Sequence, residues 1–225
     1  MKPDASRHSG ALIWDLPTRV FHWLTVALVV TSWITAEIGG NAMTVHVWSG
    51  LSLLTLVLFR VVWGVVGGTY ARFTNFVRGP RAAAEYGAAL LRGEANTSIG
   101  HNPLGALMVV ALLVNLVVQA TTGLFANDDV MLEGPLAARV SKETSDLLTK
   151  VHHLSFDVLL VLVALHIAAA MFYLVIKREN LIRPMITGRK PVPETQADRL
   201  ATPGRLWLAA LLLALCAAAV WLPLA

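Results

Sequence analysis

The sequence predicts an all-α integral membrane protein, a bundle of transmembrane helices, and two observations support this fold class. Of its 225 residues, 56% are hydrophobic and only 14% are charged, a balance too apolar for a water-soluble domain of this size. Five apolar stretches each reach the length of about 20 residues that a helix needs to cross roughly 30 Å of hydrocarbon. The expected spans are 18–38, 45–68, 104–126, 151–177 and 206–224.

The basic residues predict how these spans are oriented. The N-terminal segment carries Lys2, Arg7 and Arg19, the loop between the second and third spans carries four arginines, and residues 177–205 carry seven lysines and arginines. The 39–44 turn has no basic residue, and the 127–150 loop has three against five acidic ones. Because lysine and arginine concentrate in cytoplasmic loops, the N-terminus is expected in the cytoplasm and the C-terminus in the periplasm of a bacterial inner membrane.

The same distribution accounts for the net charge of +4, because the basic residues follow membrane sides and form no patch with interleaved aromatics. We therefore expect no nucleic-acid partner. The segment before Arg19 lacks an apolar core with a small-residue cleavage site, so the first span is expected to remain as an anchor. Between the spans, the composition predicts short surface helices over 82–92 and 136–150 and a linker over 188–204.

Cys216 is the only cysteine, which excludes an internal disulfide, a thiolate-rich metal cluster and a covalent Cys-x-x-Cys-His haem site. Any haem must therefore be of the b type. The last span, which contains Cys216, has no other ionisable side chain, and we interpret it as a packing or lipid-facing helix.

Five of the seven histidines lie inside or at the rim of a span, and the spacing of four of them is informative. His152 and His166 are 14 residues apart in the fourth span, so they share a helix face about four turns and 21 Å apart. Given the expected topology, His22 at the start of the first span lies level with His166, and His46 at the start of the second lies level with His152. The sequence thus predicts the pairs His22/His166 and His46/His152.

Two such pairs at different depths fit two haem irons, because paired axial imidazoles at two levels suit electron transfer across a membrane. Zinc is the rival metal, but two histidines per level do not complete a closed four-ligand site. A rival from another class is a haem-free membrane scaffold or transporter, in which the histidines form hydrogen bonds between helices or line a substrate path. A substrate path does not require pairs of histidines on different helices at the same depth in the membrane.

Three further residues are candidates for haem contact. Arg60 lies 14 residues after His46, on the same helix face and at the depth of His22 and His166, where a haem propionate would neutralise it. Arg19, one turn before His22, is a second propionate candidate, although a basic residue at a cytoplasmic helix end is also ordinary. Gly50, one turn after His46, would let a flat porphyrin approach, or it serves helix packing.

Three other residues have weaker assignments. His153 points about 100° away from His152 and is expected to be a neighbour of the site or a surface residue. Asp157 and His101 are candidates for proton handling during quinone chemistry. Alternatively, Asp157 reaches the interface and His101 is a helix-entry residue.

The chain resembles the bacterial di-haem cytochrome b561 family, which includes the b-type subunits of nickel-iron hydrogenases. The stretches that carry the resemblance are WDLPTRVFHW at 14–23, HVWSG at 46–50, FRVVWG at 59–64, GHNPLGALM at 100–108 and the HHLSFDVLLVLVALH run that ends at His166. The similarity covers about residues 13–190, and the family's haem ligands match His22, His46, His152 and His166. The sequence looks closer to the stand-alone members than to the hydrogenase subunit.

This resemblance implies a four-helix di-haem core over residues 1–190, followed by a linker and an extra transmembrane helix over 191–225. It implies two haem b groups and electron transfer between the quinone pool, ubiquinone or menaquinone, and a redox partner. The implied partner is a periplasmic cytochrome c, superoxide or a dehydrogenase, and a haem-bearing anchor subunit of a dehydrogenase complex is the alternative. Whether the chain is itself a quinone oxidoreductase, and whether it forms a homodimer, stays open.

Overall fold

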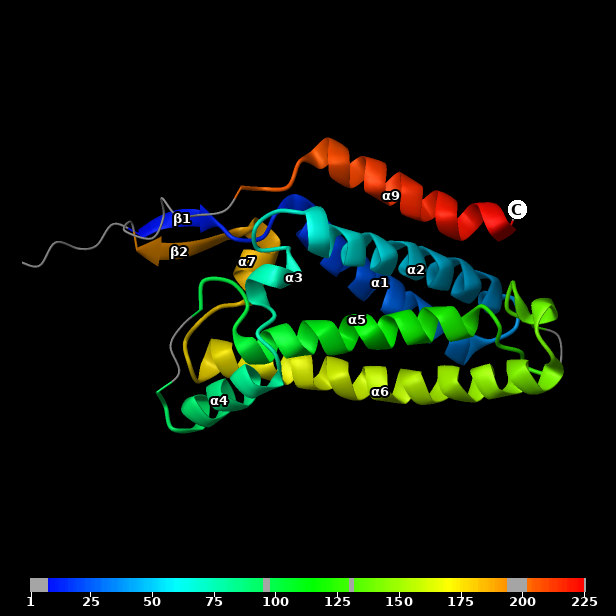
Figure 1. The fold of residues 1–225 in the computed structure, drawn as a ribbon. Helices are drawn as coiled ribbons and strands as arrows, with labels where there is room; N and C mark the ends of the chain where they lie inside the picture. Colours follow the sequence, from blue (N-terminus) through cyan, green and yellow to red (C-terminus); the bar gives the residue numbers. More distant parts are fainter. Residues whose placement is uncertain (1–7, 95–97, 130–131, 194–201, 225) are drawn as a thin grey trace, which may run out of the picture. The chain divides into compact units, whose positions relative to one another are not determined.

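A computed structural model of the chain describes residues 8–94, 98–129, 132–193 and 202–224. Five of its helices are long and apolar enough to cross a membrane, and the chain is a multi-pass helical membrane protein (Figure 1). These helices are α1 (Leu16–Ile38), α2 (Ala42–Val66), α5 (Pro103–Gly123), α6 (Lys142–Val175) and α9 (Leu206–Trp221), the last continued by the 3-10 turn η2 (Leu222–Leu224). All five expected spans are confirmed, with shifted ends.

Shorter elements connect the spans. They are α3 (Phe73–Phe76), α4 (Pro80–Leu91), the 3-10 turn η1 (Ala137–Arg139), α7 (Ile182–Thr187) and the strands β1 (His8–Leu12) and β2 (Arg189–Pro193). The surface helix expected over 82–92 corresponds to α4. The surface helix expected over 136–150, leading into the fourth span, corresponds to η1 and to the first turns of α6, which begins at Lys142 and runs without a break into the span.

The early start of α6 has a local cause. The hydroxyl of Ser141 accepts a hydrogen bond from the backbone N–H of Thr144 at 3.3 Å, and Glu143 lies in the first turn. A hydroxyl at the residue before a helix satisfies a free backbone donor, and an acidic side chain in the first turn interacts favourably with the helix dipole. These residues begin the helix in the polar segment, about two turns before the apolar residues that predict the span.

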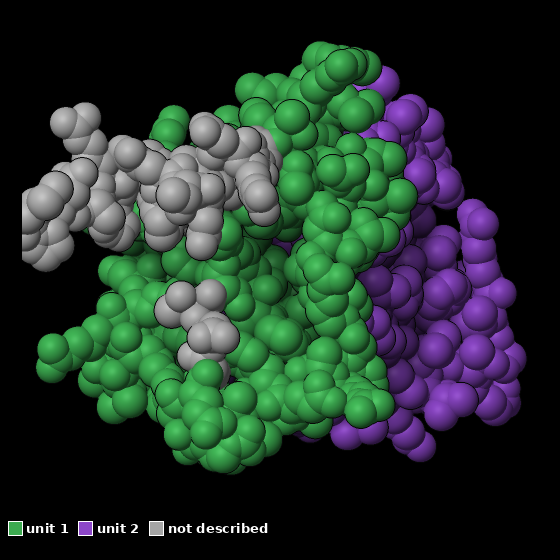
Figure 2. Space-filling view, turned by 60° about the vertical axis from the view of Figure 1, so that its left-hand side comes forward, with its two compact units in different colours: residues 1–20, 62–109, 167–209 green, residues 21–61, 110–166, 210–225 purple. Residues whose placement is uncertain are grey.

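The chain forms two compact units, which are coloured separately in Figure 2. Unit 1 comprises residues 1–20, 62–109 and 167–209, and unit 2 comprises residues 21–61, 110–166 and 210–225. Unit 2 therefore contains most of each long helix and η1, whereas unit 1 contains α3, α4, α7, both strands and one end of each long helix.

Unit 2 has an apolar core in which α2 is the central element. Leu51 and Leu54 of α2 pack with Ala120 of α5 and Val220 of α9. Of the apolar window of α2, 61% is buried, against at most 17% for any other long helix. The other helices present their apolar side chains outwards, as expected for surfaces that face lipid.

Unit 1 contains a pair of strands that the sequence did not predict. β1 and β2 are antiparallel, with a register from His8 opposite Pro193 to Leu12 opposite Arg189. The pairing continues where the backbone N–H groups of Ile13 and Trp14 donate to the carbonyl of Gly188. The linker expected over 188–204 is thus wrong for 189–193, whereas 194–201 lie outside the described residues.

Asp15 links the start of α1 to α2 within unit 1. Its Oδ1 accepts a hydrogen bond from the N–H of Thr18 at 3.0 Å, which caps α1. Its Oδ2 accepts one from Nε1 of Trp63 at 3.2 Å, and Trp63 is fully buried. A buried indole N–H needs such an acceptor, so Asp15 satisfies two donors at once.

Candidate functional site

All four histidines with matching spacing lie in unit 2. His22 belongs to α1, His46 to α2, and His152 and His166 to α6. The ring centroids of His22 and His166 are 6.3 Å apart, and those of His46 and His152 are 6.2 Å apart. The structure therefore brings together the two pairs that the spacing predicts.

These separations match imidazoles that ligate one metal ion from opposite sides. A metal–imidazole bond measures about 2.0 Å and the nitrogen lies about 1.1 Å from its ring centre, so two rings that ligate one ion from opposite sides have centroids about 6.2 Å apart. Distance alone does not identify a pair, because His152 and His153 also have centroids 6.3 Å apart. These two are chain neighbours on one helix, however, whereas each predicted pair joins two different helices.

The rings of His46 and His152 are both held through Nδ1. His46 Nδ1 lies 2.8 Å from the carbonyl oxygen of Ser32, and His152 Nδ1 lies 2.9 Å from that of Gln119. A carbonyl oxygen can only accept, so both Nδ1 atoms carry the proton. Each Nε2 therefore keeps its lone pair, which is the protonation state that a metal-ligating imidazole needs.

Neighbouring polar contacts fix these carbonyls in place. The hydroxyl of Ser32 shares a 2.7 Å hydrogen bond with Ser49, which is buried and also donates to the carbonyl of His46. On α5, the hydroxyl oxygen of Thr122 lies 3.3 Å from His152 Nδ1 and can accept from it, because the hydroxyl donates to Val118. Helices α1 and α2 thus meet at the level of His46 through polar contacts.

The side chain of Gln119 is the one group that competes for His152 Nε2. Its Nε2 lies 3.1 Å from His152 Nε2, and its Oε1 accepts a hydrogen bond from Ser155. Metal ligation by His152 would require this carboxamide to turn away, whereas the backbone carbonyl of Gln119 would keep its bond to Nδ1.

Gly123, at the end of α5, packs closely against the ring of His152. A Cβ at this position would lie 2.9 Å from Cε1 and 3.2 Å from Nδ1 of His152, closer than side chains normally approach. Sequence reasoning missed Gln119, Thr122 and Gly123. A signal was present, because Asn115, Gln119 and Thr122 share one face of an otherwise apolar helix.

The surroundings of the His22/His166 pair differ from those of the His46/His152 pair. His22 Nδ1 is buried and has no hydrogen-bond partner among the described residues. Arg60 is only 3% exposed and lies 14 residues after His46 in α2. A haem propionate would carry the opposite charge at this depth, and the contact of Arg60 with a propionate stays a prediction.

Gly50 is the one candidate whose surroundings show room for a flat group. No atom lies within 4 Å of the position that a Cβ would take there. Gly50 thus does not serve a close helix contact among the described residues, which favours the interpretation that it makes space.

The remaining candidates have other contacts. Arg19 lies in unit 1, where its Nη1 donates to the carbonyl of Ile186 at 2.5 Å, so its contact with a propionate stays a prediction. His101, also in unit 1, lies between the rings of Trp14 and Phe76, with both centroid distances 4.5 Å. His153 and Asp157 are exposed side chains of α6.

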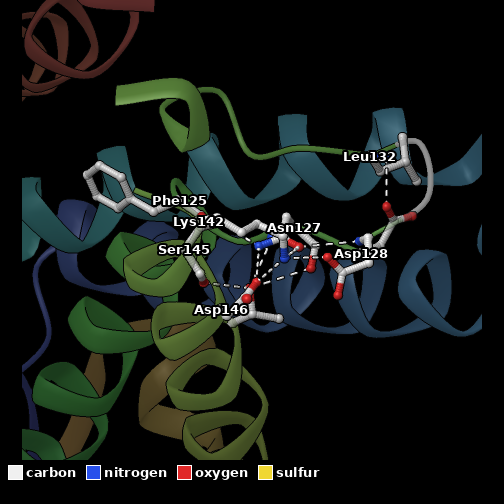
Figure 3. Close-up of polar contacts among 9 residues, drawn as sticks. Phe125, Asn127, Asp128, Leu132, Lys142, Ser145 and Asp146 are labelled. Atoms are coloured by element: carbon white, nitrogen blue, oxygen red, sulfur yellow. Dashed lines mark hydrogen bonds and ion pairs between the residues drawn. The ribbon is translucent and has the colours of Figure 1, made fainter. Parts of the chain in front are cut away.

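The loop between α5 and α6 is fastened to the first turns of α6, a few residues before His152 (Figure 3). The side-chain amide of Asn127 donates to Ser145 at 2.5 Å and to Asp146 at 3.0 Å. Lys142 forms an ion pair with Asp146 and donates to Asn127. These contacts hold the end of α5, with Gly123, beside α6.

No group of three or more His, Cys, Asp or Glu side chains in the described ranges is placed to hold a metal ion by itself. Each histidine pair offers two ligands, so a metal there needs further ligands of its own. A porphyrin supplies four nitrogen atoms around an iron and leaves two axial positions for a histidine pair. The donor set thus fits a b-type haem at each pair.

Comparison with known proteins gives a family match over most of the chain. The family model described as prokaryotic cytochrome b561 matches residues 13–188. Similar curated proteins are named probable Ni/Fe-hydrogenase B-type cytochrome subunits. That of Azotobacter chroococcum is 25% identical and that of Rhizobium leguminosarum 26%, with 85% and 83% of this chain and 93% and 91% of the relatives covered. No solved structure matches the chain.

Proposed function

The chain belongs to the prokaryotic cytochrome b561 family and is a haem-bearing membrane electron-transfer protein, and on this premise we propose that it holds two b-type haems. His22 and His166 would ligate one iron, and His46 and His152 the other. The observation that carries the proposal is the pair of centroid separations, 6.3 and 6.2 Å, each between two helices. The haems supply one-electron chemistry at iron, and the chain supplies ligands and a place in the membrane.

The chain contributes to this function by positioning the histidine rings that would bind the haems. Ser32 and Gln119 hold the rings of His46 and His152 through backbone carbonyls, which keeps both Nε2 atoms directed away from those carbonyls. Arg60 would neutralise a propionate near His22 and His166, and Gly50 would leave room for a porphyrin face. Because the two pairs are separated by four turns of α6, about 21 Å, they would form two steps across the membrane.

We further propose that this path connects the quinone pool with a redox partner. The positive-inside distribution of lysine and arginine supports a cytoplasmic N-terminus and a periplasmic C-terminus. On this orientation the His46/His152 site lies toward the periplasm and the His22/His166 site toward the cytoplasm. A periplasmic cytochrome c or superoxide would then exchange electrons at the His46/His152 site.

A second candidate is a haem-bearing anchor subunit of a dehydrogenase complex. The curated relatives favour it, because they are named hydrogenase subunits and are covered over more than nine-tenths of their length. This candidate keeps both haem sites and changes only the partner. Purification in mild detergent, followed by mass spectrometry of co-purifying proteins, separates it from a stand-alone cytochrome, which would copurify with no stoichiometric dehydrogenase.

The haem assignment is tested by His152→Ala. This variant should lose the haem at His46 and keep the haem at His22/His166, so the purified protein should carry half of the wild-type haem per chain by pyridine haemochrome assay. His153→Ala, the matched control on the neighbouring residue, should keep both haems. Retention of the full haem content in His152→Ala would refute the pairing.

A further inference from the structure

The chain turns sharply where α6 ends, and a short second helix, α7, follows the turn. α6 ends at Val175, and Arg178 has a φ of 54°, a left-handed conformation that is common just after a helix. Across the turn, the N–H of Glu179 donates to the carbonyl of Tyr173 at 2.9 Å. α7 is therefore not a continuation of α6, and its direction is set separately.

Local contacts hold α7 in a defined orientation within unit 1. The side-chain oxygen of Asn180 accepts hydrogen bonds from the backbone N–H groups of Ile182 and Arg183, at 3.0 and 2.8 Å, which satisfies free donors at the start of the helix. Pro184 is buried, and Met185 packs against the apolar cluster formed by the end of β1 and the residues before α1. One side of α7 thus faces the protein, and the other side faces outwards.

The outward side of α7 combines apolar and basic side chains. Ile182 and Ile186 are 37% and 59% exposed, and because they are four residues apart they lie on one helix face. Arg183 of α7 and Arg178 in the preceding turn are also exposed. Neither arginine forms an ion pair with an acidic side chain in the part of the chain that the structure describes.

The exposed arginines near α4, in the same unit, have a different environment. Arg81 pairs with a glutamate one helical turn away, and Arg92 pairs with a glutamate two residues away. Between 175 and 193 the only acidic residue is Glu179, which pairs with Lys190. The positive charge beside α7 is therefore left uncompensated by nearby acidic side chains.

α7 follows directly after a transmembrane span, so it lies at the membrane surface. The apolar run of α6 ends with Val175 and Ile176, which are 62% and 64% exposed. A helix with apolar side chains beside basic ones is stable at the boundary between hydrocarbon and lipid headgroups. There the isoleucines reach acyl chains, and the flexible arginine side chains reach phosphate groups.

We propose that α7 and the turn before it bind an anionic phospholipid of the leaflet at this end of α6. The guanidinium groups of Arg178 and Arg183 bind the lipid phosphate, and Ile182 and Ile186 contact the acyl chains. With the cytoplasmic N-terminus proposed above, this is the cytoplasmic leaflet. The site uses none of the histidines of the haem proposal, so it goes beyond the proposed function and does not depend on it.

The experiment is a lipid titration of the purified, delipidated full-length protein in detergent, with bound lipid counted by native mass spectrometry. Phosphatidylglycerol is the anionic probe, and phosphatidylcholine, which has no net charge, is the comparison. Each arginine should contribute about fivefold to the affinity, so Arg178→Gln/Arg183→Gln should weaken phosphatidylglycerol binding about 30-fold and leave phosphatidylcholine binding unchanged. An unchanged affinity for phosphatidylglycerol, or equal losses for both lipids, overturns the inference.

The matched control is the double variant Arg81→Gln/Arg92→Gln. It removes two exposed arginines from the same unit, but each has an acidic neighbour, so the affinity for phosphatidylglycerol should stay at the wild-type value. A loss as large as that of Arg178→Gln/Arg183→Gln would show that binding follows net charge alone, which overturns the assignment of a site to α7.

Ile186→Ser tests the apolar part of the site. Because this side chain is exposed, its replacement should leave the fold intact and weaken phosphatidylglycerol binding roughly tenfold through lost acyl contact. Inorganic phosphate has the charge of the headgroup without acyl chains, so it should not displace the bound lipid. Displacement by phosphate, or an unchanged affinity in Ile186→Ser, would show that the surface binds a free anion and not a lipid.

The haem content separates this inference from the proposed function. All of these variants should keep the wild-type ratio of haem to protein, because none of the substituted residues is a proposed ligand. Loss of lipid selectivity with normal haem content supports the lipid site, whereas wild-type protein without lipid selectivity overturns that site and leaves the haem proposal intact. Fewer than two haems per chain overturns only the haem proposal.

Discussion

The contacts that stabilise the interior of unit 1 differ in kind from those that stabilise the interior of unit 2. Unit 1 depends on polar contacts between segments far apart in the sequence: the β1–β2 pairing, the Asp15–Trp63 hydrogen bond and the hydrogen bond from Lys190 to the carbonyl of Ser98. Unit 2 is built from apolar helix faces, and its polar contacts gather around His46 and His152 and in the α5–α6 loop.

This difference follows from the solvent of each region. Between helices in lipid there is no hydrophobic driving force, so packing and hydrogen bonds must hold them together. In unit 2 each histidine pair joins two helices, and a haem at each pair would add a further link between them. We therefore expect changes in unit 2 to alter haem content, and changes in unit 1 to alter stability while the haem spectrum stays the same.

The largest effect is expected from removing one ligand of each pair in unit 2. The double variant His22→Ala/His46→Ala should lose both haems, because each iron keeps one axial imidazole and the helices lose two links. Absorbance spectroscopy of the purified protein should show no b-type bands. Reduced bands at half intensity or more in this variant would mean that other residues ligate at least one iron.

A smaller effect is expected from Lys190→Ala in unit 1. The Lys190 and Glu179 side chains are only 15% and 17% exposed, and Lys190 also donates to the carbonyl of Ser98 at 2.6 Å. Removing the lysine leaves a largely buried carboxylate unpaired, which should lower the free energy of unfolding by about 2–3 kcal/mol. Thermal unfolding in detergent measures the loss.

The control for this variant is Arg81→Ala. Arg81 forms an ion pair with Glu85 on α4, but the two side chains are 93% and 65% exposed, so its loss should not measurably change stability. Lys190→Ala should also keep the wild-type ratio of haem to protein. A haem loss in Lys190→Ala equal to that in a histidine variant would contradict the expectation that changes in unit 1 alter stability but not haem content.

Asp15→Ala should lower the free energy of unfolding by about 1–2 kcal/mol. The variant removes the cap of α1 and leaves the buried Nε1 of Trp63 without the acceptor that Asp15 provides. Asp15→Asn, which keeps acceptor oxygen, should recover part of the loss. Equal losses in both variants would show that the carboxylate charge, and not its acceptor geometry, is what stabilises unit 1.

The smallest effect is expected for Trp221→Phe in α9. Nε1 of Trp221 donates to the hydroxyl of Thr55 in α2 at 3.3 Å, and the ring packs edge-on against Trp48. Phenylalanine keeps an aromatic ring and loses the hydrogen bond, so the cost should be about 0.5–1 kcal/mol with unchanged haem content. A loss of haem would mean that α9 supports the site and does more than cover α2.

The sequence predicted the membrane spans and the histidine pairs because both depend on local, periodic features. Apolar length identifies a span without knowledge of its neighbours, and the 14-residue spacing of His152 and His166 places them on one face through helix geometry alone. Charge-derived topology then supplied the matching levels of His22 and His46. None of these steps required knowledge of the packing between helices.

The features that were missed depend on distant or backbone contacts. β1 and β2 are five residues each, and their partners are about 180 positions apart, so no local pattern reveals the pairing. The bonds to Ser32 and Gln119 use backbone carbonyls, which carry no mark in the sequence. Gly123 matters because His152 packs against it, and that contact exists only once α5 and α6 lie side by side.

Electron paramagnetic resonance of the oxidised, purified protein is the most direct measurement of whether two imidazole pairs each hold an iron. Two ferric low-spin signals, each typical of bis-imidazole ligation and together equal to two irons per chain, are the result we predict. A high-spin ferric signal as the main species, or low-spin iron at one per chain or less, would contradict the account.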